Sequence, residues 1–419
     1  MATPLDQLDR ASTLGGTGSE ASAFVISMAE ALGTFGTPAH RLEEALTTLS
    51  ERLGLEVQIF AMPTAVFVSL REPPASAETI LIRVQPGEVN LERLVELDEI
   101  LVDVAEGKCS AAKGNLRLAD VLSKPQRYGA GLMLVSFAVA SASASRFFGG
   151  GIREILASGF IGLAVGALIV VASKRRESAR LIDFMCGIIA SAAALLGAKA
   201  FGPVATEVVT VAGLIVLIPG LTLTMAINEL ATRNLVAGTA RMMSAFTVLV
   251  SIGFGVALGT RLGGLLNIQQ AAASDPSQPL PGWTLYLALL IAPAALSVLF
   301  KARPRDIPVL MCSGTIAFLS AKFGSQFLGP ELGICLGAFL TGLYSNAYSR
   351  LAGRPVAVPA MPGIMLLVPG SISFQSLSSF LANDALNGVE TAFTTILLAM
   401  SLVVGLMLSN VALPPRRSL

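Results

Sequence analysis

The sequence predicts a helical membrane protein with about ten transmembrane helices, arranged as two inverted five-helix repeats after a small α+β cytoplasmic domain. Three observations predict this fold class. The chain is 53% hydrophobic with a mean hydropathy of +0.71, which is too apolar for a soluble domain of 419 residues. Acidic residues gather in its first part and basic residues in its second. A hydrophobic module at residues 215–242 is echoed 150 positions later by residues 365–392.

The charge distribution divides the chain near Tyr128. Residues 1–127 carry 11 lysine and arginine residues against 18 acidic residues, whereas residues 128–419 carry 18 against 10. The N-terminus shows no basic segment followed by an apolar core and a small-residue cleavage site. We therefore expect the first part to stay in the cytoplasm, as a flexible tail (1–18) and a folded domain (19–127).

The cytoplasmic domain is predicted to mix helices and strands. The second of two helices within 19–54 should have Thr37 as its N-cap and Pro38 at its first position. Alternating apolar runs then indicate strands, and a further apolar periodicity indicates a last helix. These later elements are strands over 55–70, with a break at Met62-Pro63, and over 79–84, and a helix over 91–106.

The membrane part contains enough apolar sequence for ten spans, because one span needs about 20 mostly apolar residues. The predicted spans are 129–148, 155–172, 181–201, 206–227, 238–260, 283–300, 307–322, 331–349, 356–377 and 389–410. They form a first half (128–261) and a second half (283–411), joined by a polar external linker (262–282) and followed by a cytoplasmic tail (412–419).

The distribution of basic residues predicts how the chain crosses the membrane. With the N-terminus inside, fifteen basic residues fall in cytoplasmic segments and five in external ones, which favours both termini in the cytoplasm. The offset of 150 carries the third span onto the eighth and the fifth onto the tenth, so each half has five spans. Because five is odd, the halves should cross in opposite senses and support alternating access.

Each copy of the repeated module contains a Pro-Gly pair, Pro219-Gly220 and Pro369-Gly370. Proline removes a backbone donor and clashes with the preceding turn, so both helices should break there. A helix starting after either glycine would point its positive end at a carboxylate, and freed carbonyls could accept from an ammonium group. Nearby polar side chains either bind such a zwitterion or satisfy the broken backbone. With the Pro-Gly pairs, the predicted substrate-binding residues are Thr222, Thr224, Asn228, Ser371, Ser373 and Gln375.

Acidic residues are rare in the membrane part. A charge near the bilayer centre is costly and usually functional, whereas one at the interface is cheap. For proton-coupled transport, the candidates are Asp183, Glu229 and Asp384. Arg241 either pairs with Glu229 or Asp183 or anchors its helix at the interface.

The single histidine, His40, is followed by Arg41, Glu43 and Glu44, and Glu44 lies one helical turn beyond it. Such a cluster is a solvated helix face, a gating or regulatory surface, or a catalytic site. We predict a gating or regulatory role for these four residues together with Arg241. None of the four cysteines has metal-ligand spacing, so we expect neither a metal nor another cofactor.

Several segments resemble the threonine/serine exporter family: AHRLEEALTTLSERLGLEVQIFAMPTAVFVSL, then IPGLTLTMAINEL followed by AGTARM, and finally LVPG. The resemblance runs from about Ala23 to Leu408 and implies a secondary exporter of L-threonine and L-serine, driven by proton motive force in the bacterial cytoplasmic membrane. Asn383-Asp384 replaces Arg233-Asn234 of the first half, which argues against a fully symmetric site. The matching motif positions are His40, Arg41, Glu43, Pro63, Thr64, Pro219, Gly220, Asn228, Gly238, Arg241, Pro369 and Gly370.

Two other functions stay open at this level. A scaffold or channel regulated through the cytoplasmic domain would lack saturable flux that follows the proton gradient, and a membrane-tethered enzyme using His40 would turn over as residues 1–127 alone. The expected partners are a small amino acid, protons and the lipid bilayer, with no nucleic acid. Four-residue glycine spacing, as at Gly255, Gly259 and Gly263, suits either a homo-oligomer or packing within one subunit.

Overall fold

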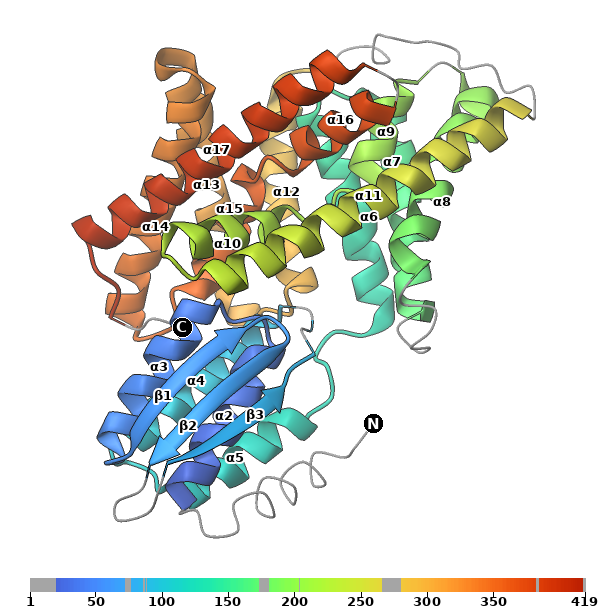
Figure 1. Ribbon diagram of the computed structural model, residues 1–419. Coiled ribbons are helices and arrows are strands. Elements are labelled where there is room, and N and C mark those ends of the chain that lie inside the picture. The colour runs from blue at the N-terminus through green and yellow to red at the C-terminus, as the bar shows by residue number, and fades with distance from the viewer. Residues whose placement is uncertain are drawn as a thin grey trace.

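The computed structural model describes residues 20–71, 77–85, 87, 89–172, 181–202, 204–265, 280–381 and 384–416. A small domain with a three-stranded sheet lies below a larger helical region (Figure 1). The predicted tail (1–18) lies outside the described residues. The predicted linker (262–282) begins inside a helix that continues to Leu265, and its residues 266–279 also lie outside the described part.

The small domain packs helices against one face of an antiparallel sheet. The strands pair in the order β1-β2-β3, and a tight hairpin at Pro63-Thr64 joins β1 to β2, as the break at Met62-Pro63 predicts. Phe24, Met28 and Val66 are fully buried in the core between the layers. The elements are α2 (Glu20–Thr34), α3 (Ala39–Arg52), β1 (Glu56–Met62), β2 (Ala65–Arg71), β3 (Glu78–Arg83), α4 (Leu91–Ala105) and α5 (Ala111–Ser123).

Two details of this domain differ from the prediction. Helix α3 begins at Ala39, and Pro38 is its N-cap with φ −58° and ψ 145°, so the assignment of Thr37 as N-cap was wrong. The Pro38 carbonyl accepts from the amides of Arg41 and Leu42, which closes the first turn without a side-chain cap. Helix α5 was not predicted.

The helical region follows in two halves of matching order. The first contains α6 (Ala130–Phe147), α7 (Ile152–Ala172), α8 (Ile182–Phe201), α9 (Thr206–Gly213), α10 (Gly220–Ala231) and α11 (Leu235–Leu265). The second contains α12 (Trp283–Leu299), the short 3₁₀ helix η2 (Pro304–Asp306), α13 (Ile307–Leu328), α14 (Pro330–Ala352), α15 (Ala357–Leu367), α16 (Gly370–Leu381) and α17 (Ala385–Ala412).

The 150-residue repeat is visible in the helix bounds. Helices α10 and α16 are each twelve residues long and begin at Gly220 and Gly370. Helices α11 and α17 begin at Leu235 and Ala385, again 150 positions apart. Each half packs its long last helix on the corresponding earlier one, α11 on α8 and α17 on α14, and each short helix also contacts the long helix of the other half. The opposite orientation of the halves across a bilayer stays a prediction.

Seven described helical segments are long and apolar enough to cross a membrane: Ala130–Phe147, Ile152–Ala172, Ile182–Lys199, Leu235–Gly263, Pro304–Leu328, Ala357–Ser379 and Ala385–Ala412. The count of ten is therefore not confirmed. Of the other three predicted spans, 206–227 is split into two short helices, and 283–300 corresponds to the 17-residue α12. The eighth corresponds to α14, a 23-residue helix that carries glycine, serine and asparagine among its buried residues.

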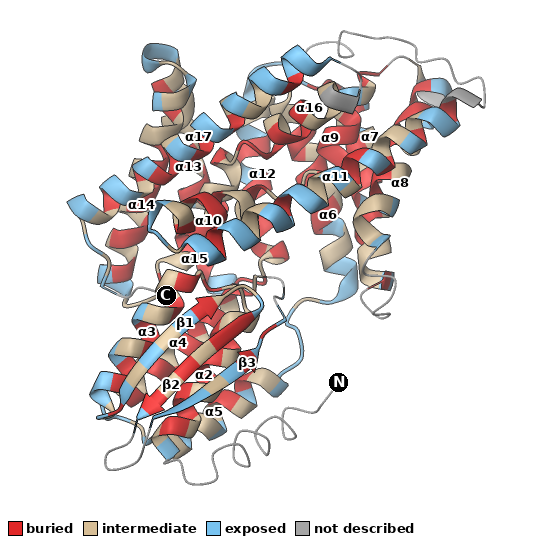
Figure 2. Ribbon diagram, viewed as in Figure 1, coloured by how far each residue is buried: buried red, intermediate tan, exposed pale blue. Residues whose placement is uncertain are grey.

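Apolar side chains cover the outer surface of the two long helices, which slant across the front of the helical region in Figure 1. On α11 these include Met243, Phe246 and Phe254, and on α17 Phe393 and Met400, all more than 40% exposed. Figure 2 shows such exposed residues along the outer sides of α11 and α17, with buried residues toward the interior. An apolar surface this long is stable when it faces lipid. The chain is thus a multi-pass membrane protein.

Glycines allow the paired helices to approach closely. An added Cβ at Gly255 of α11 would overlap the carbonyl oxygen of Phe184 on α8. At the position 150 residues later, an added Cβ at Gly405 of α17 would overlap the carbonyl oxygen of Cys335 on α14. The small-residue spacing of the sequence therefore marks packing inside one subunit.

Candidate functional site

Both predicted helix breaks are present. In the first half α9 ends at Gly213, a run of turns follows, and the helix restarts at Gly220 as α10. In the second half α15 ends at Leu367 and α16 begins at Gly370. Pro219 and Pro369 each stand just before a helix, where the missing amide hydrogen costs no intrahelical bond.

The two breaks touch each other. A Cβ placed on Gly220 would lie 3.5 Å from the Cα of Gly370, and one placed on Gly370 would lie 3.6 Å from the Cα of Gly220. The same Cβ on Gly220 would overlap Val368, and the one on Gly370 would meet Ile218 at 3.0 Å. Glycine at both positions therefore lets the two backbones meet without displacing Val368 or Ile218, and a side chain at Gly220 would have to displace Val368.

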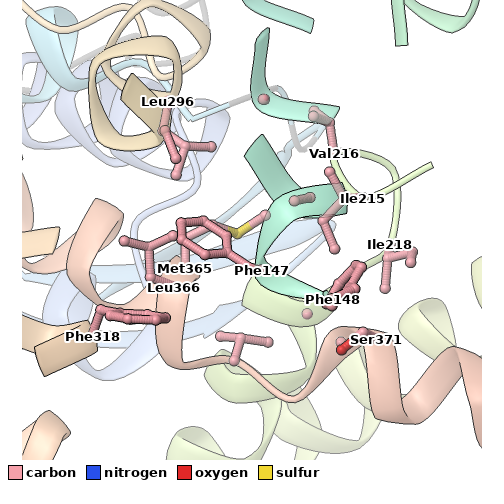
Figure 3. A pocket seen from close by; sticks show the side chains of 16 residues that line it. Phe147, Phe148, Ile215, Val216, Ile218, Leu296, Phe318, Met365, Leu366 and Ser371 are labelled. Atoms are coloured by element: carbon pink, nitrogen blue, oxygen red, sulfur yellow. The ribbon is translucent and has the colours of Figure 1, made fainter. Parts of the chain in front are cut away.

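A central cavity of about 150 Å³ lies beside this contact. Gly220, Gly370 and Ser371 line one part of it, and aromatic and aliphatic side chains line the rest (Figure 3). Phe147 of α6 and Phe318 of α13 pack with ring centroids 5.2 Å apart at its wall. The volume is many times the roughly 10–15 Å³ that one water requires, so a small solute fits. Among the side chains labelled in Figure 3, Ser371 is the one that carries an oxygen atom, in its hydroxyl group.

The starts of two helices lie at this mostly apolar cavity. The first amides of an α-helix have no acceptor within the helix, and the N-terminus carries about half a positive charge. The first residues of α10 and α16, Gly220 and Gly370, both line the cavity. The Gly220 amide already donates to the carbonyl of Ile218 at 2.7 Å, but the dipoles of two helices meet at one small space and together favour a negatively charged group such as a carboxylate.

The predicted hydroxyl and amide residues take different positions. Thr224 donates to the carbonyl of Gly220 at 3.1 Å, and Ser373 donates to the carbonyl of Pro369 at 3.0 Å, so each satisfies a backbone acceptor beside its break. Thr222 is half-buried on α10, and Gln375 of α16 is exposed. Of the hydroxyl residues, Ser371 is the one that lines the central cavity.

A buried ion pair joins the two domains. Both carboxylate oxygens of Glu229, at the end of α10, lie 3.0 Å from Arg241 Nε on α11. The same carboxylate accepts from the amide of Ala39, the first residue of α3, at 3.0 Å, and Arg241 donates to the carbonyl of Thr37 at 3.5 Å. Because the carboxylate lies at a helix N-terminus, the α3 dipole favours its charge.

The residues of the small domain with a predicted gating role cluster around this ion pair. His40 is held neutral, because burial and then the charges of Arg41 and Arg241 lower its pKa to about 4. Burial also lowers the pKa of Arg41, whose ion pair with Glu44 is long at 4.0 Å. Burial raises the pKa of Glu43, although this carboxylate accepts from the amide of Ala61 at 2.8 Å.

The other two acidic candidates, Asp384 and Asp183, lie at the starts of α17 and α8 and not at a helix break. Asp384 is exposed and caps α17, accepting from the amide of Asn387 at 3.2 Å. Asp183 is half-buried in the first turn of α8. Among the described residues, no three His, Cys, Asp or Glu side chains come together in a metal-binding arrangement.

A second cavity, of about 500 Å³, lies between the small N-terminal domain and the helical region. We call it the interdomain cavity. Its wall on one side is the start of α3, and on the other it is formed by α10, α14, α15 and α17. The predicted site residues among its lining are Thr224, Asn228, His40, Arg41 and Glu44.

Two buried polar residues were missed from the sequence. Glu154 is fully buried, and its carboxylate accepts from the amides of Gly151 at 3.0 Å and Ala205 at 3.1 Å, which ties α7 to the start of α9. Asn346 of α14 is 1% exposed and lines the interdomain cavity. In the sequence, each of the two is a polar residue at or within an apolar run. Placing such a residue in the membrane costs free energy unless its polar atoms have hydrogen-bond partners.

A multi-pass membrane protein with paired helix breaks beside a central cavity has the architecture of a transporter. A family described as "Putative threonine/serine exporter" matches residues 23–263, and "Threonine/Serine exporter, ThrE" matches residues 285–412. The chain belongs to the threonine/serine exporter family. That family is described by transport and not by an enzymatic reaction.

Three similar curated proteins come from yeasts. Pheromone-regulated membrane protein 10 of Saccharomyces cerevisiae is 29% identical to this chain, and the match covers 89% of this chain and 49% of the relative. The protein of the same name from Debaryomyces hansenii is 28% identical, and the match covers 88% of this chain and 37% of the relative. An uncharacterized Schizosaccharomyces pombe protein is 26% identical over 94% and 51%. The chain thus spans about a third to a half of the length of these relatives. No solved structure matches.

Proposed function

We propose that this protein is a secondary transporter that exports small hydroxylated amino acids, L-threonine and L-serine, by alternating access around its two helix breaks. Proton motive force drives it, and it works in a bacterial cytoplasmic membrane with both termini inside. The observation that carries the proposal is the contact between Gly220 and Gly370, which brings two helix N-termini to one cavity.

The chemistry of the central cavity suits such a substrate. An α-amino acid carries a carboxylate, which the two N-termini favour. The Ser371 hydroxyl offers a donor and an acceptor to a substrate hydroxyl or ammonium. The rest of the wall is aromatic and aliphatic, which suits the methyl group of threonine and excludes water. Threonine and serine therefore match the cavity better than an amino acid with a large charged side chain.

Alternating access requires elements that move against each other. Helices α10 and α16 are short, each follows a break, and each packs on the long helices α11 and α17 of both halves. A tilt of this pair would open the central cavity to one side of the membrane and close it to the other. Of the three predicted proton-coupling acids, Glu229 is the one attached to the moving helix and to both domains.

Efflux of preloaded labelled threonine from cells tests the proposal. We expect saturable efflux that an uncoupler abolishes and that Gly220→Leu removes, because the added side chain overlaps Val368. The matched control is Gly197→Leu in α8, where an added Cβ meets nothing within 4 Å. Both variants are compared at equal membrane expression. Efflux by the unsubstituted protein no faster than by cells lacking it would sink the proposal, and non-saturable flux would favour a channel.

A further inference from the structure

The interdomain cavity has the size and position of a ligand site. At about 500 Å³ it falls within the range of small-molecule pockets, roughly 300–1,000 Å³, and such pockets prefer domain interfaces. Its lining combines apolar residues such as Met225 and Met361 with a few polar and charged groups. An apolar pocket with few, fixed polar groups recognises a small solute by orienting it.

The polar groups of this cavity are incompletely partnered. The Arg41 guanidinium has a side chain only 20% exposed, and its ion pair with Glu44 is at the limiting distance of 4.0 Å. His40 Nδ1 and Asn346 Oδ1 are buried and have no hydrogen-bond partner in the part of the chain that the structure describes. Burial of an unpaired polar atom costs free energy, so a ligand that pairs with these groups binds favourably.

The amide of Asn346 is held in a defined orientation. Its Nδ2 donates to Asn410 Oδ1 at 2.9 Å on α17, which leaves Oδ1 as an acceptor. His40 is neutral at neutral pH, so one of its ring nitrogens is also an acceptor. The cavity therefore offers a neighbouring cation and anion, Arg41 and Glu44, together with neutral acceptors, which is the complement of a zwitterion that also carries a hydroxyl.

The interdomain and central cavities share a wall, because neighbouring residues of the same two segments line one or the other. Leu221 lines the interdomain cavity and Gly220, the residue before it, lines the central one. On α15, Ile364 faces the interdomain cavity, whereas Met365 and Leu366 line the central one. The wall is thus made by the start of α10 and the end of α15, the segments at the two breaks, and a shift of α10 would join the two spaces.

We propose that the interdomain cavity is a reception site for the exported amino acid, in which Arg41 pairs with its carboxylate and Glu44 with its ammonium group. This inference rests on the proposed export of threonine and serine. The amino acid binds first between the two domains and passes the wall at Leu221 and Ile364 to reach the central cavity. The cytoplasmic domain is then part of the binding site and not only a regulator.

The kinetic test is efflux measured over a range of internal threonine concentrations. Arg41→Gln should raise the half-saturating concentration roughly tenfold or more, the usual cost of a lost charge-assisted hydrogen bond, with a maximal rate close to that of the unsubstituted protein. Arg52→Gln, the same change at an exposed position on the same helix, should leave it unaltered. Equal half-saturation for the two variants overturns the inference.

A binding test on the purified full-length protein needs no transport. Threonine should slow alkylation of the thiol introduced by Thr232→Cys, which lies in the cavity lining, and should not slow it in Thr239→Cys, an exposed position on α11. Threoninol, which lacks the carboxylate, should protect neither. Alkylation of the Thr232→Cys variant at its ligand-free rate in saturating threonine overturns the reception site. If the unsubstituted protein shows no efflux, the proposed export function is wrong. Protection of the Thr232→Cys thiol by threonine still decides whether the cavity binds the amino acid.

Discussion

Glu229 and Arg241 form an ion pair with side chains 0% and 13% exposed, and the same carboxylate accepts from the amide of Ala39 in the other domain. One carboxylate therefore joins α10, α11 and the start of α3. A buried ion pair is weak evidence for stability, because desolvation offsets the attraction. Removing one partner is different, since it leaves the other charge buried and alone.

We expect Glu229→Leu and Arg241→Leu each to reduce the free energy of unfolding by about 3–5 kcal/mol. The double variant should recover most of that loss, with about 1 kcal/mol remaining because the Ala39 amide keeps no acceptor. Unfolding of the purified proteins, analysed as a double-mutant cycle, measures the coupling. A double variant as unstable as the sum of its parts would show that the two side chains do not act as a pair.

The same double variant separates two roles of Glu229. If Glu229 carries a proton during transport, efflux by the folded double variant should lose its sensitivity to an uncoupler. If the carboxylate serves only to join the domains, that sensitivity persists while the rate changes. Efflux in vesicles with and without an imposed proton gradient distinguishes the two outcomes.

His40 predicts a pH dependence of stability. Its pKa is lowered to about 4 in the folded protein from an ordinary value of 6.5, so the unfolded state binds the proton first as the pH falls. The stability contributed by neutral His40 is complete above pH 6.5 and is lost between 6.5 and 4, by about 2 kcal/mol between pH 7 and 5. His40→Gln, which stays neutral, should show a shallower decline in thermal unfolding experiments. Parallel curves for the two proteins would contradict this assignment.

Two glycines 150 positions apart should be equally intolerant of substitution. Gly255→Ala and Gly405→Ala each place a Cβ on a backbone carbonyl of the neighbouring helix and should cost about 1–3 kcal/mol by overpacking. Gly197→Ala in α8 meets open space and should instead stabilise its helix by up to about 1 kcal/mol. Thermal unfolding of the three variants measures the difference. A loss at Gly255 without one at Gly405 would argue against equivalent packing in the two halves.

The helix breaks could be predicted from the sequence because their cause is local. Proline and glycine act on their own helix, so Pro219-Gly220 and Pro369-Gly370 interrupt it whatever surrounds them. The repeat offset also predicted that α10 and α16 would begin at equivalent positions. That the two breaks touch each other could not be predicted, because no local signal encodes a contact between segments 150 residues apart.

The contacts between the two domains could not be predicted from the sequence for the same reason. For Arg241 the sequence left open a pair with Glu229, a pair with Asp183 or an interface anchor, and the structure shows the pair with Glu229 because α10 and α11 form a tight pair. The link from Glu229 to Ala39 crosses 190 positions and depends on how one domain packs on the other. Glu154 was missed because a carboxylate at the start of an apolar run has the same pattern whether it faces lipid headgroups or accepts two buried amides.

Leu91 should hold the two domains together without supporting the fold of either. It is 1% exposed and packs with Ala302, Leu310, Val358 and Met361 of the helical region, whereas Leu97, on the same helix, lies in the core of the small N-terminal domain. Either change to alanine should reduce stability by about 2–5 kcal/mol. The loss in Leu91→Ala should fall on the contact between the domains, and the loss in Leu97→Ala on the core of the small domain. We expect Leu91→Ala to expose the connection around Lys124–Gly129 to protease while amide protection in the sheet persists, and Leu97→Ala to lower that protection itself. Hydrogen exchange with proteolysis measures both, and loss of sheet protection in Leu91→Ala would mean that the domain depends on docking for its own stability.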